Sequence, residues 1–256
     1  MSRHLFLLRE LVRRDFAARY AGSSLGWLWS FLQPLWMLAL FSFVFSVVLK
    51  TPLLGQRTGN FGVFLFCGLL PWLAVHEGLV RATTAITDNG HLIKKLRFPP
   101  EILVLAVVVT ALLQQLITSA LFIAVLAWLG ELSLPTLPLL LVALPVQLGL
   151  MVGLGSLFAA IHVFVRDTSQ LLGLVLQTWF YLTPIVYPLE AVPEPYRDWL
   201  RLNPLVALVE LYRQAFLGPG FSRVEGLGWL AAFTVAAACA GTLLFRRLKP
   251  VFVDEI

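Results

Sequence analysis

Residues 102–129 read ILVLAVVVTALLQQLITSALFIAVLAWL, 28 residues in a row without a charged side chain. A helix needs about 20 predominantly apolar residues to cross the hydrocarbon core of a bilayer. In lipid, every backbone amide and carbonyl must find a partner within the protein, and a helix provides these partners along its own axis. This stretch therefore predicts a membrane-spanning helix.

Apolar runs of similar character occur on both sides of this stretch. Together they predict six spans, over residues 28–49, 61–80, 102–129, 137–165, 171–187 and 227–245. Only 13% of the 256 residues are charged, about half of the fraction in soluble domains, which is too few to cover a water-facing surface. We expect an all-α, polytopic membrane protein whose residues 1–256 form a single transmembrane domain. The composition excludes an ordinary cytosolic enzyme.

The distribution of basic residues indicates the orientation of the spans. Thirteen of the nineteen Lys and Arg residues fall in the N-terminal segment, the second and fourth connections and the tail, residues 246–256. Because Lys and Arg accumulate on the cytoplasmic side of membrane proteins, both termini are expected in the cytoplasm. The net charge of +5 does not indicate nucleic-acid binding, since the spans leave no solvated basic domain.

Two segments outside the spans also have apolar faces. At helical spacing, the apolar residues of segment 1–22 share one face while arginines occupy the others, which predicts an amphipathic helix in the membrane interface. A topological anchor without further role is the alternative. In segment 188–220, prolines precede an apolar piece, 204–217, that is too short to cross. This pattern favours short re-entrant gate helices over an amphipathic surface loop.

The motifs of common catalytic sites are absent from the sequence. It contains no G-x-x-x-x-G-K-[ST], no H-E-x-x-H and no G-x-S-x-G, and Cys67 and Cys239 lack metal-ligand spacing. We therefore expect no catalytic residue and no metal site. The pair His76 and Glu77 is a titratable cluster within a span and could serve an intramembrane enzyme. An ion pair between Glu77 and Arg81, four residues later, is the structural interpretation that we favour.

Aromatic and amide side chains recur at helical spacing in the first and fifth spans. Aromatic faces can stack on sugars, while Gln and Tyr hydrogen-bond to hydroxyls, so this pattern suits the lining of a glycan channel. Interfacial aromatic belts and helix packing are the alternative. The candidate lining residues are Trp29, Gln33, Trp36, Phe43, Gln177 and Tyr181.

The second connection predicts a short cytoplasmic helix within residues 86–98. Pro99 and Pro100 end it, and a rigid helix between two spans could transmit motion from a cytoplasmic partner. A basic loop attracted to anionic lipid is the alternative. The candidate coupling residues are His91, Leu92, Lys94, Lys95, Leu96 and Arg97.

An ordered set of motifs resembles a known family. Residues 14–20 (RDFAARY), 24–29 (SLGWLW) and 33–34 (QP) are similar to the opening of ABC-2 type permeases, the Wzm-like membrane subunits of O-antigen, capsule and teichoic-acid exporters. Four further segments match in order: FPPE at 98–101, FVRD at 164–167, WFYLTPIVYP at 179–188, and NPL through YR at 203–213. The double proline at 99–100 departs from the family pattern.

The resemblance implies a homodimer with two copies of a separate ATPase, which binds ATP and Mg, while this chain binds no cofactor. It implies a bacterial inner-membrane protein, surrounded by lipid, that exports a polyprenyl-diphosphate-linked polysaccharide. Arg14 and Arg19 would then be placed to meet the diphosphate, since Arg makes charge-assisted contacts with phosphates. A drug or small-lipid exporter of the same superfamily is the alternative.

Overall fold

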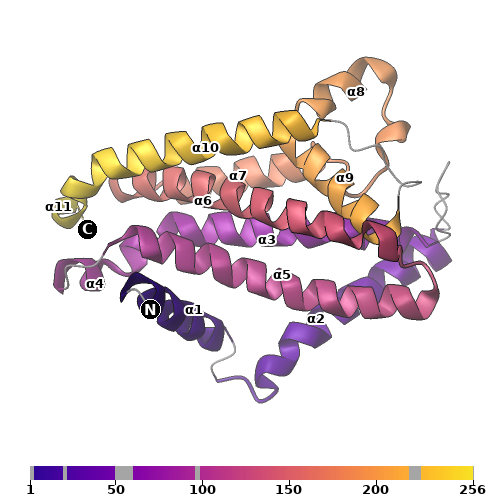
Figure 1. Ribbon diagram of the computed structural model, residues 1–256, viewed down its shortest axis with the longest axis horizontal. Coiled ribbons are helices and arrows are strands. Elements are labelled where there is room, and N and C mark those ends of the chain that lie inside the picture. Colours follow the sequence, from indigo (N-terminus) through magenta and orange to yellow (C-terminus); the bar gives the residue numbers. More distant parts are fainter. Residues whose placement is uncertain (1–2, 20–21, 50–59, 96–98, 219–225, 256) are drawn as a thin grey trace.

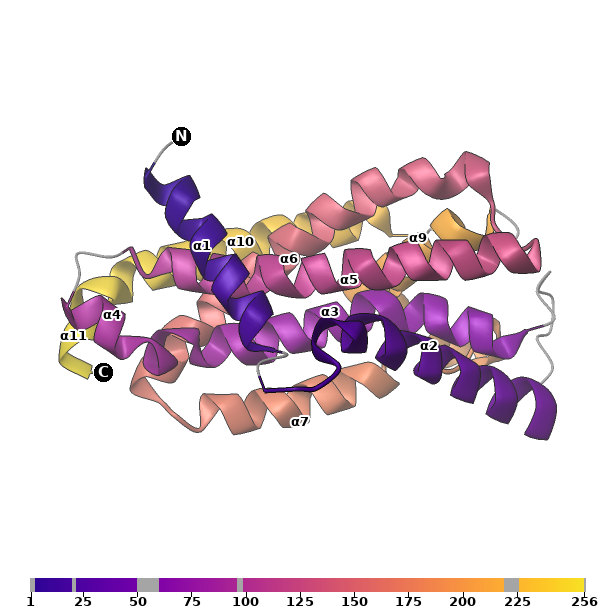
Figure 2. The same ribbon diagram turned by 90° about the horizontal axis from the view of Figure 1, so that it is seen from below.

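The computed structural model describes residues 3–19, 22–49, 60–95, 99–218 and 226–255, and every regular element within them is helical. The long helices run side by side in an elongated bundle, and both ends of the chain lie at the same end of it (Figures 1 and 2). Five described helical segments are long and apolar enough to cross a membrane: Gly26–Val48, Phe61–Asp88, Glu101–Leu129, Leu134–Phe164 and Leu227–Val251. They confirm the all-α class and five of the predicted spans.

The elements follow one another along the chain without any strand in the described residues. They are α1 (Arg3–Ala18), η1 (Gly26–Leu28), α2 (Trp29–Phe41), the π-helix η2 (Ser42–Val48), α3 (Phe61–Asp88), α4 (Gly90–Lys95), α5 (Glu101–Leu129), η3 (Leu134–Leu139), α6 (Leu140–Phe164), α7 (Thr168–Tyr181), η4 (Leu189–Ala191), α8 (Glu194–Arg201), α9 (Pro204–Leu217), α10 (Leu227–Leu248), η5 (Lys249–Val251) and α11 (Phe252–Glu255).

Helix α3 is the centre of the bundle and contacts α2, α5, α6, α7 and α9. Asn60 starts it, because its side-chain oxygen accepts hydrogen bonds from the backbone amides of Gly62 and Val63. The helix continues eight residues beyond the predicted span end at residue 80. In these added turns Arg81 pairs with Asp15 of α1.

Helices α6 and α10 form the most extensive helix pair of the bundle. A Cβ atom on Gly241 would lie 2.0 Å from the carbonyl oxygen of Gly153, so the two backbones touch where both residues lack a side chain. Close approach through small residues is a common way to pack membrane helices. This pair forms a closely packed side of the bundle.

The fifth predicted span, 171–187, is wrong at both ends. Helix α7 begins at Thr168 and has 14 residues, about 21 Å at 1.5 Å per residue, against a hydrocarbon core of about 30 Å. It ends because Pro184 has no amide to continue the helix, and the Ile185 amide bonds instead to the carbonyl of Thr183. Apolar composition extended the prediction past a turn.

The two short helices expected between the fifth and sixth spans are present as α8 and α9. Thirteen of the fourteen residues of α9 are buried, so the interpretation of this piece as a surface loop is wrong. Asn203 caps α9, and its side chain also bonds to Trp179 and Thr183 near the end of α7. Helix α8 lies at the outer edge of the bundle, beyond α9 (Figure 1).

The predicted tail, residues 246–256, is helical over its described part. Helix α10 continues to Leu248, and Phe252 of α11 is fully buried against Phe164 and Phe245. The Lys249 ammonium group lies 2.7 Å from a carboxylate oxygen of Glu101. The tail therefore packs under the ends of α5 and α6.

Candidate functional site

Helix α1 lies across α5 at the end of the bundle that holds both termini (Figure 2). The apolar residues predicted to share one face, Leu5, Leu8, Val12 and Phe16, line a shallow groove together with residues of α5. The predicted amphipathic helix is therefore present, and its apolar face lies along a span of the same chain.

Polar side chains of α1 and of the residue that follows it bond to side chains of α3 and its C-terminal cap. Arg14 donates a 3.0 Å hydrogen bond to the side-chain oxygen of Asn89, Asp15 pairs with Arg81, and Arg19 lies 2.5 Å from a Glu77 carboxylate oxygen. Arg81 also lies 3.5 Å from Glu77, the predicted pair four residues apart. We call this cluster the polar clasp; its residues are Arg14, Asp15, Arg19, Glu77, Arg81 and Asn89.

The polar clasp contains two predicted site residues, Arg14 and Arg19. Arg14 and Arg19 were expected to meet a substrate diphosphate, and the structure engages both with side chains of α3. Asp15 and Asn89 were missed by the sequence reasoning. Asp15 had a signal, since it is one of only two carboxylates in the arginine-rich helix α1. Asn89, the residue that ends α3, had none beyond its turn-forming character.

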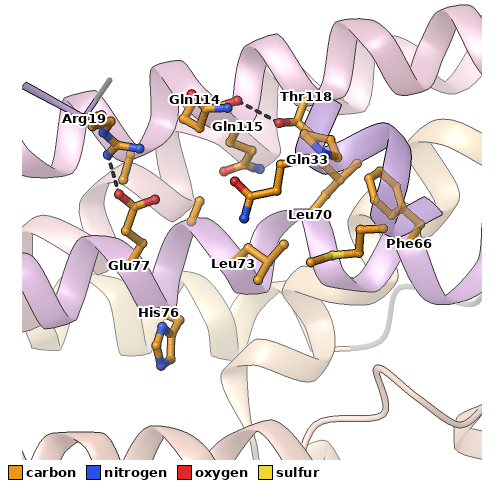
Figure 3. Close-up of a pocket in the computed structure, with 14 residues that line it drawn as sticks. Arg19, Gln33, Phe66, Leu70, Leu73, His76, Glu77, Gln114, Gln115 and Thr118 are labelled. Atoms are coloured by element: carbon orange, nitrogen blue, oxygen red, sulfur yellow. Dashed lines mark hydrogen bonds and ion pairs between the residues drawn. The ribbon is translucent and has the colours of Figure 1, made fainter. Parts of the chain in front are cut away.

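A cavity of about 230 Å³ lies beside the clasp, between α2, α3 and α5. Figure 3 shows Arg19 meeting Glu77 at one side of it, with Gln33, Gln114 and Gln115 grouped further along. His76 also lines this cavity, but its side chain points in a different direction from that of Glu77 (Figure 3). The two residues therefore do not converge on one reaction centre, which argues against an intramembrane enzyme that uses both.

The predicted lining residues lie on two helices that flank α3. On α2 and η2, Trp36 is 72% exposed and Phe43 57% exposed, and Trp29 and Gln33 are also exposed. The π-helical turn from Ser42 breaks the predicted four-three spacing before Phe43, because a π-helix closes its hydrogen bonds one residue later.

On the other flank of α3, helix α7 presents the remaining predicted lining residues. Gln177 is exposed, and Tyr181, the last residue of the helix, is 62% exposed. Helices α2 and α7 both contact α3. The aromatic and amide side chains of the two flanks are therefore open to a partner or a ligand in the isolated chain.

The described part of the predicted coupling helix is α4, Gly90–Lys95, and residues 96–98 lie outside the described residues. His91 and Lys94 are exposed, Leu92 is half-buried, and Ile93, which the sequence reasoning had not chosen, is buried. Leu96 and Arg97 lie outside the described residues, as does the side chain of Lys95. The Leu92 amide bonds to the Asn89 carbonyl, so α4 begins at the residue that Arg14 of α1 holds.

The long apolar helices and the exposed aromatic faces are those of an integral membrane protein. Residues 7–217 match the family described as ABC-2 type transporter, and the chain belongs to that family. The transmembrane permease role follows from this membership.

Curated relatives cover nearly the whole chain. The O-antigen export system permease protein RfbA of Myxococcus xanthus is 34% identical over 252 residues, which are 98% of this chain and 95% of that protein. The protein of the same name from Klebsiella pneumoniae is 27% identical, over 97% of this chain and 94% of its own. The polysialic acid transport protein KpsM of Escherichia coli is also 27% identical, over 97% and 95%.

Proposed function

We propose that this chain is the permease subunit of an ABC exporter that moves a polyprenyl-diphosphate-linked polysaccharide, similar to O-antigen, from the cytoplasm across the inner membrane. The observation that carries the proposal is the 34% identity to an O-antigen export permease along 98% of the chain. The exposed aromatic and amide faces of α2 and α7 support it, because they suit a polyhydroxylated chain better than a small apolar drug.

In this proposal two copies of the chain form a homodimer, and a separate ATPase dimer binds ATP and Mg and does the hydrolysis. The α2 and α7 faces of the two protomers enclose the conduit. Helix α4, with its exposed His91 and Lys94, docks on the ATPase. The termini and α4 lie in the cytoplasm, and α1 lies in the interface.

The membrane topology in this proposal has six passes. Helix α7 and the turn after it form the fifth pass, which is completed by protein because the helix alone is shorter than the hydrocarbon core. Helices α8 and α9 form the gate at the outer end. The burial of α9 supports this, since backbone that enters the membrane without crossing must be covered by protein.

The experiment is ATP-driven export by the chain reconstituted with its cognate ATPase in lipid vesicles. A radiolabelled lipid-linked glycan is supplied on the ATP side, and its appearance in the lumen is followed with a lumenal glycosidase. ATPase whose P-loop Lys is replaced by Ala serves as the control for passive leakage. Export of fluorescent drugs or short-chain lipids without glycan export would assign the chain to the alternative class of the superfamily.

A further inference from the structure

Exposed polar side chains of the spans gather on one side of the bundle. Gln33 of α2, His76 of α3 and Gln177 of α7 are exposed, although each lies within an apolar helix. Two stretches of other spans expose only apolar residues. In α10 between Leu230 and Gly241 they are Ala231, Ala232, Val235, Ala236, Cys239 and Ala240, and in α5 from Leu113 to Ala127 they are Leu113, Leu116, Ala120, Ala124 and Ala127.

His76 lies inside the predicted span 61–80, four residues before its end and next to Glu77 of the polar clasp, and its side chain is exposed. A titratable side chain within a span is costly to expose to acyl chains, so such residues face the protein interior or water. The exposed faces of α5 and α10 suit acyl chains, whereas the side with three polar groups does not. We therefore infer that the surface around His76 is covered by water and polar ligand rather than by lipid.

The neighbours of His76 place it between the two helices that carry the aromatic faces. Its ring lies 6.2 Å from that of Trp72, and Trp72 lies 5.5 Å from Phe180 of α7. On its other side, Leu73 is 40% exposed and lines the cavity next to α2. One turn further on, Val80 is 36% exposed. An exposed stripe of α3, formed by Leu73, His76 and Val80, thus lies between α2 and α7.

We propose that this α3 stripe is a third wall of the conduit and that His76 is a glycan-contacting residue. A neutral imidazole presents one N–H donor and one acceptor nitrogen, which match the donor and acceptor of a sugar hydroxyl. The contact is a single exposed hydrogen-bonding group, so it orients a passing sugar without holding it. The proposal rests on the proposed function, because it names a residue that the exported polysaccharide touches.

The first test measures water access in membranes that contain the assembled transporter. A His76→Cys variant is treated with a charged, membrane-impermeant methanethiosulfonate, and labelled cysteines are mapped by mass spectrometry. Gln177→Cys is the positive control for the conduit. The native Cys239, exposed on the apolar face of α10, is the internal control for a lipid-facing thiol, and native Cys67 is the control for a buried one.

We expect labelling at positions 76 and 177 and none at Cys239 or Cys67. Labelling at 177 without labelling at 76 would overturn the third wall while leaving the conduit of the proposed function in place. Absence of labelling at both positions would overturn the proposal and the conduit together. Labelling of Cys239 at the same rate as position 76 would also overturn it, because water access would then not separate the two faces.

The second test separates contact with glycan from mere exposure to water. His76→Gln keeps a donor and an acceptor and should export at nearly the wild-type rate. His76→Leu removes both and should slow glycan export about fivefold, the factor that corresponds to one net hydrogen bond. ATPase binding by the variant shows that it has folded, and Ala236→Leu on the apolar face of α10 is the matched control. Wild-type export by His76→Leu would overturn the glycan contact.

Discussion

Replacement of Arg213 by Met should destabilise the protein through the anchoring of α9. The Arg213 side chain is 1% exposed. It donates to a Glu210 carboxylate oxygen at 3.2 Å and to the Ile185 carbonyl oxygen at 3.0 Å, and its guanidinium carbon lies 3.7 Å from the centre of the Phe64 ring. Methionine fills similar space without these contacts, so the buried Glu210 carboxylate loses its bond to the guanidinium group.

The expected magnitude follows from the burial of the pair. Removal of one partner from a buried ion pair lowers the free energy of unfolding by about 3–5 kcal/mol, whereas exchange of both partners for uncharged residues is close to neutral. For a chain of this size, each kcal/mol shifts Tm by about 2–4 °C. We therefore expect Arg213→Met to lower Tm by roughly 6–20 °C. The double variant with Glu210→Gln should recover most of that loss.

The assay is thermal unfolding in lipid nanodiscs, followed by intrinsic tryptophan fluorescence. Glu210→Gln alone completes the double-mutant cycle and should destabilise less than Arg213→Met, because the remaining arginine keeps the Ile185 carbonyl and the Phe64 ring as partners. A Tm of Arg213→Met within 2 °C of wild type would refute the reasoning. A double variant no more stable than Arg213→Met would show that the buried carboxylate is not the cause.

Three further predictions concern helix packing, the polar clasp and a buried hydrogen-bond network. Gly241→Leu should prevent α10 from packing against α6, so that no folded protein is recovered in size-exclusion chromatography. Gly228→Leu should be recovered normally, because a Cβ atom at that position has no neighbouring heavy atom within 4 Å. Asp15→Arg and Arg81→Asp should each lower the unfolding free energy by about 1–2 kcal/mol, and the exchanged pair should regain part of the loss, because Arg81 also contacts Glu77; additive losses would contradict the pairing. Tyr212→Phe should lose only about 1 kcal/mol in the same assay, since the two glutamines that the hydroxyl contacts also bond to each other, and a loss above 3 kcal/mol would contradict this.

Long apolar runs made most of the fold predictable. Length and composition were enough to predict the four spans other than the first and fifth. Pro71 and Pro145 lie inside helices and do not end them. The predicted bounds of the fifth span were wrong because composition does not reveal where helical hydrogen bonding stops. The bonds of Thr183 and Asn203 close that end of α7, and they depend on a residue twenty positions away.

The candidate site was predictable by residue type and only partly by arrangement. The sequence indicated that aromatic and amide side chains would share one face of α2 and one face of α7, because helical periodicity alone defines a helix face. It did not indicate that Gln33 also lines a cavity with α5, that a π-helix would shift Phe43, or that α1 would bind α3. These three features depend on how helices that are far apart in the sequence pack together, and local sequence patterns do not reveal that packing.

The polar clasp also has a consequence for how the chain is made. Asp15 and Arg81 are 66 residues apart, so at about 5–20 residues per second α1 leaves the ribosome roughly 3–13 s before its partner helix is complete. During that interval the charged side chains of α1 can be neutralised only by water and lipid headgroups. We expect α1 to take up its packed position only after α3 has been inserted, because the partner side chains of Asp15 and Arg19 lie on α3.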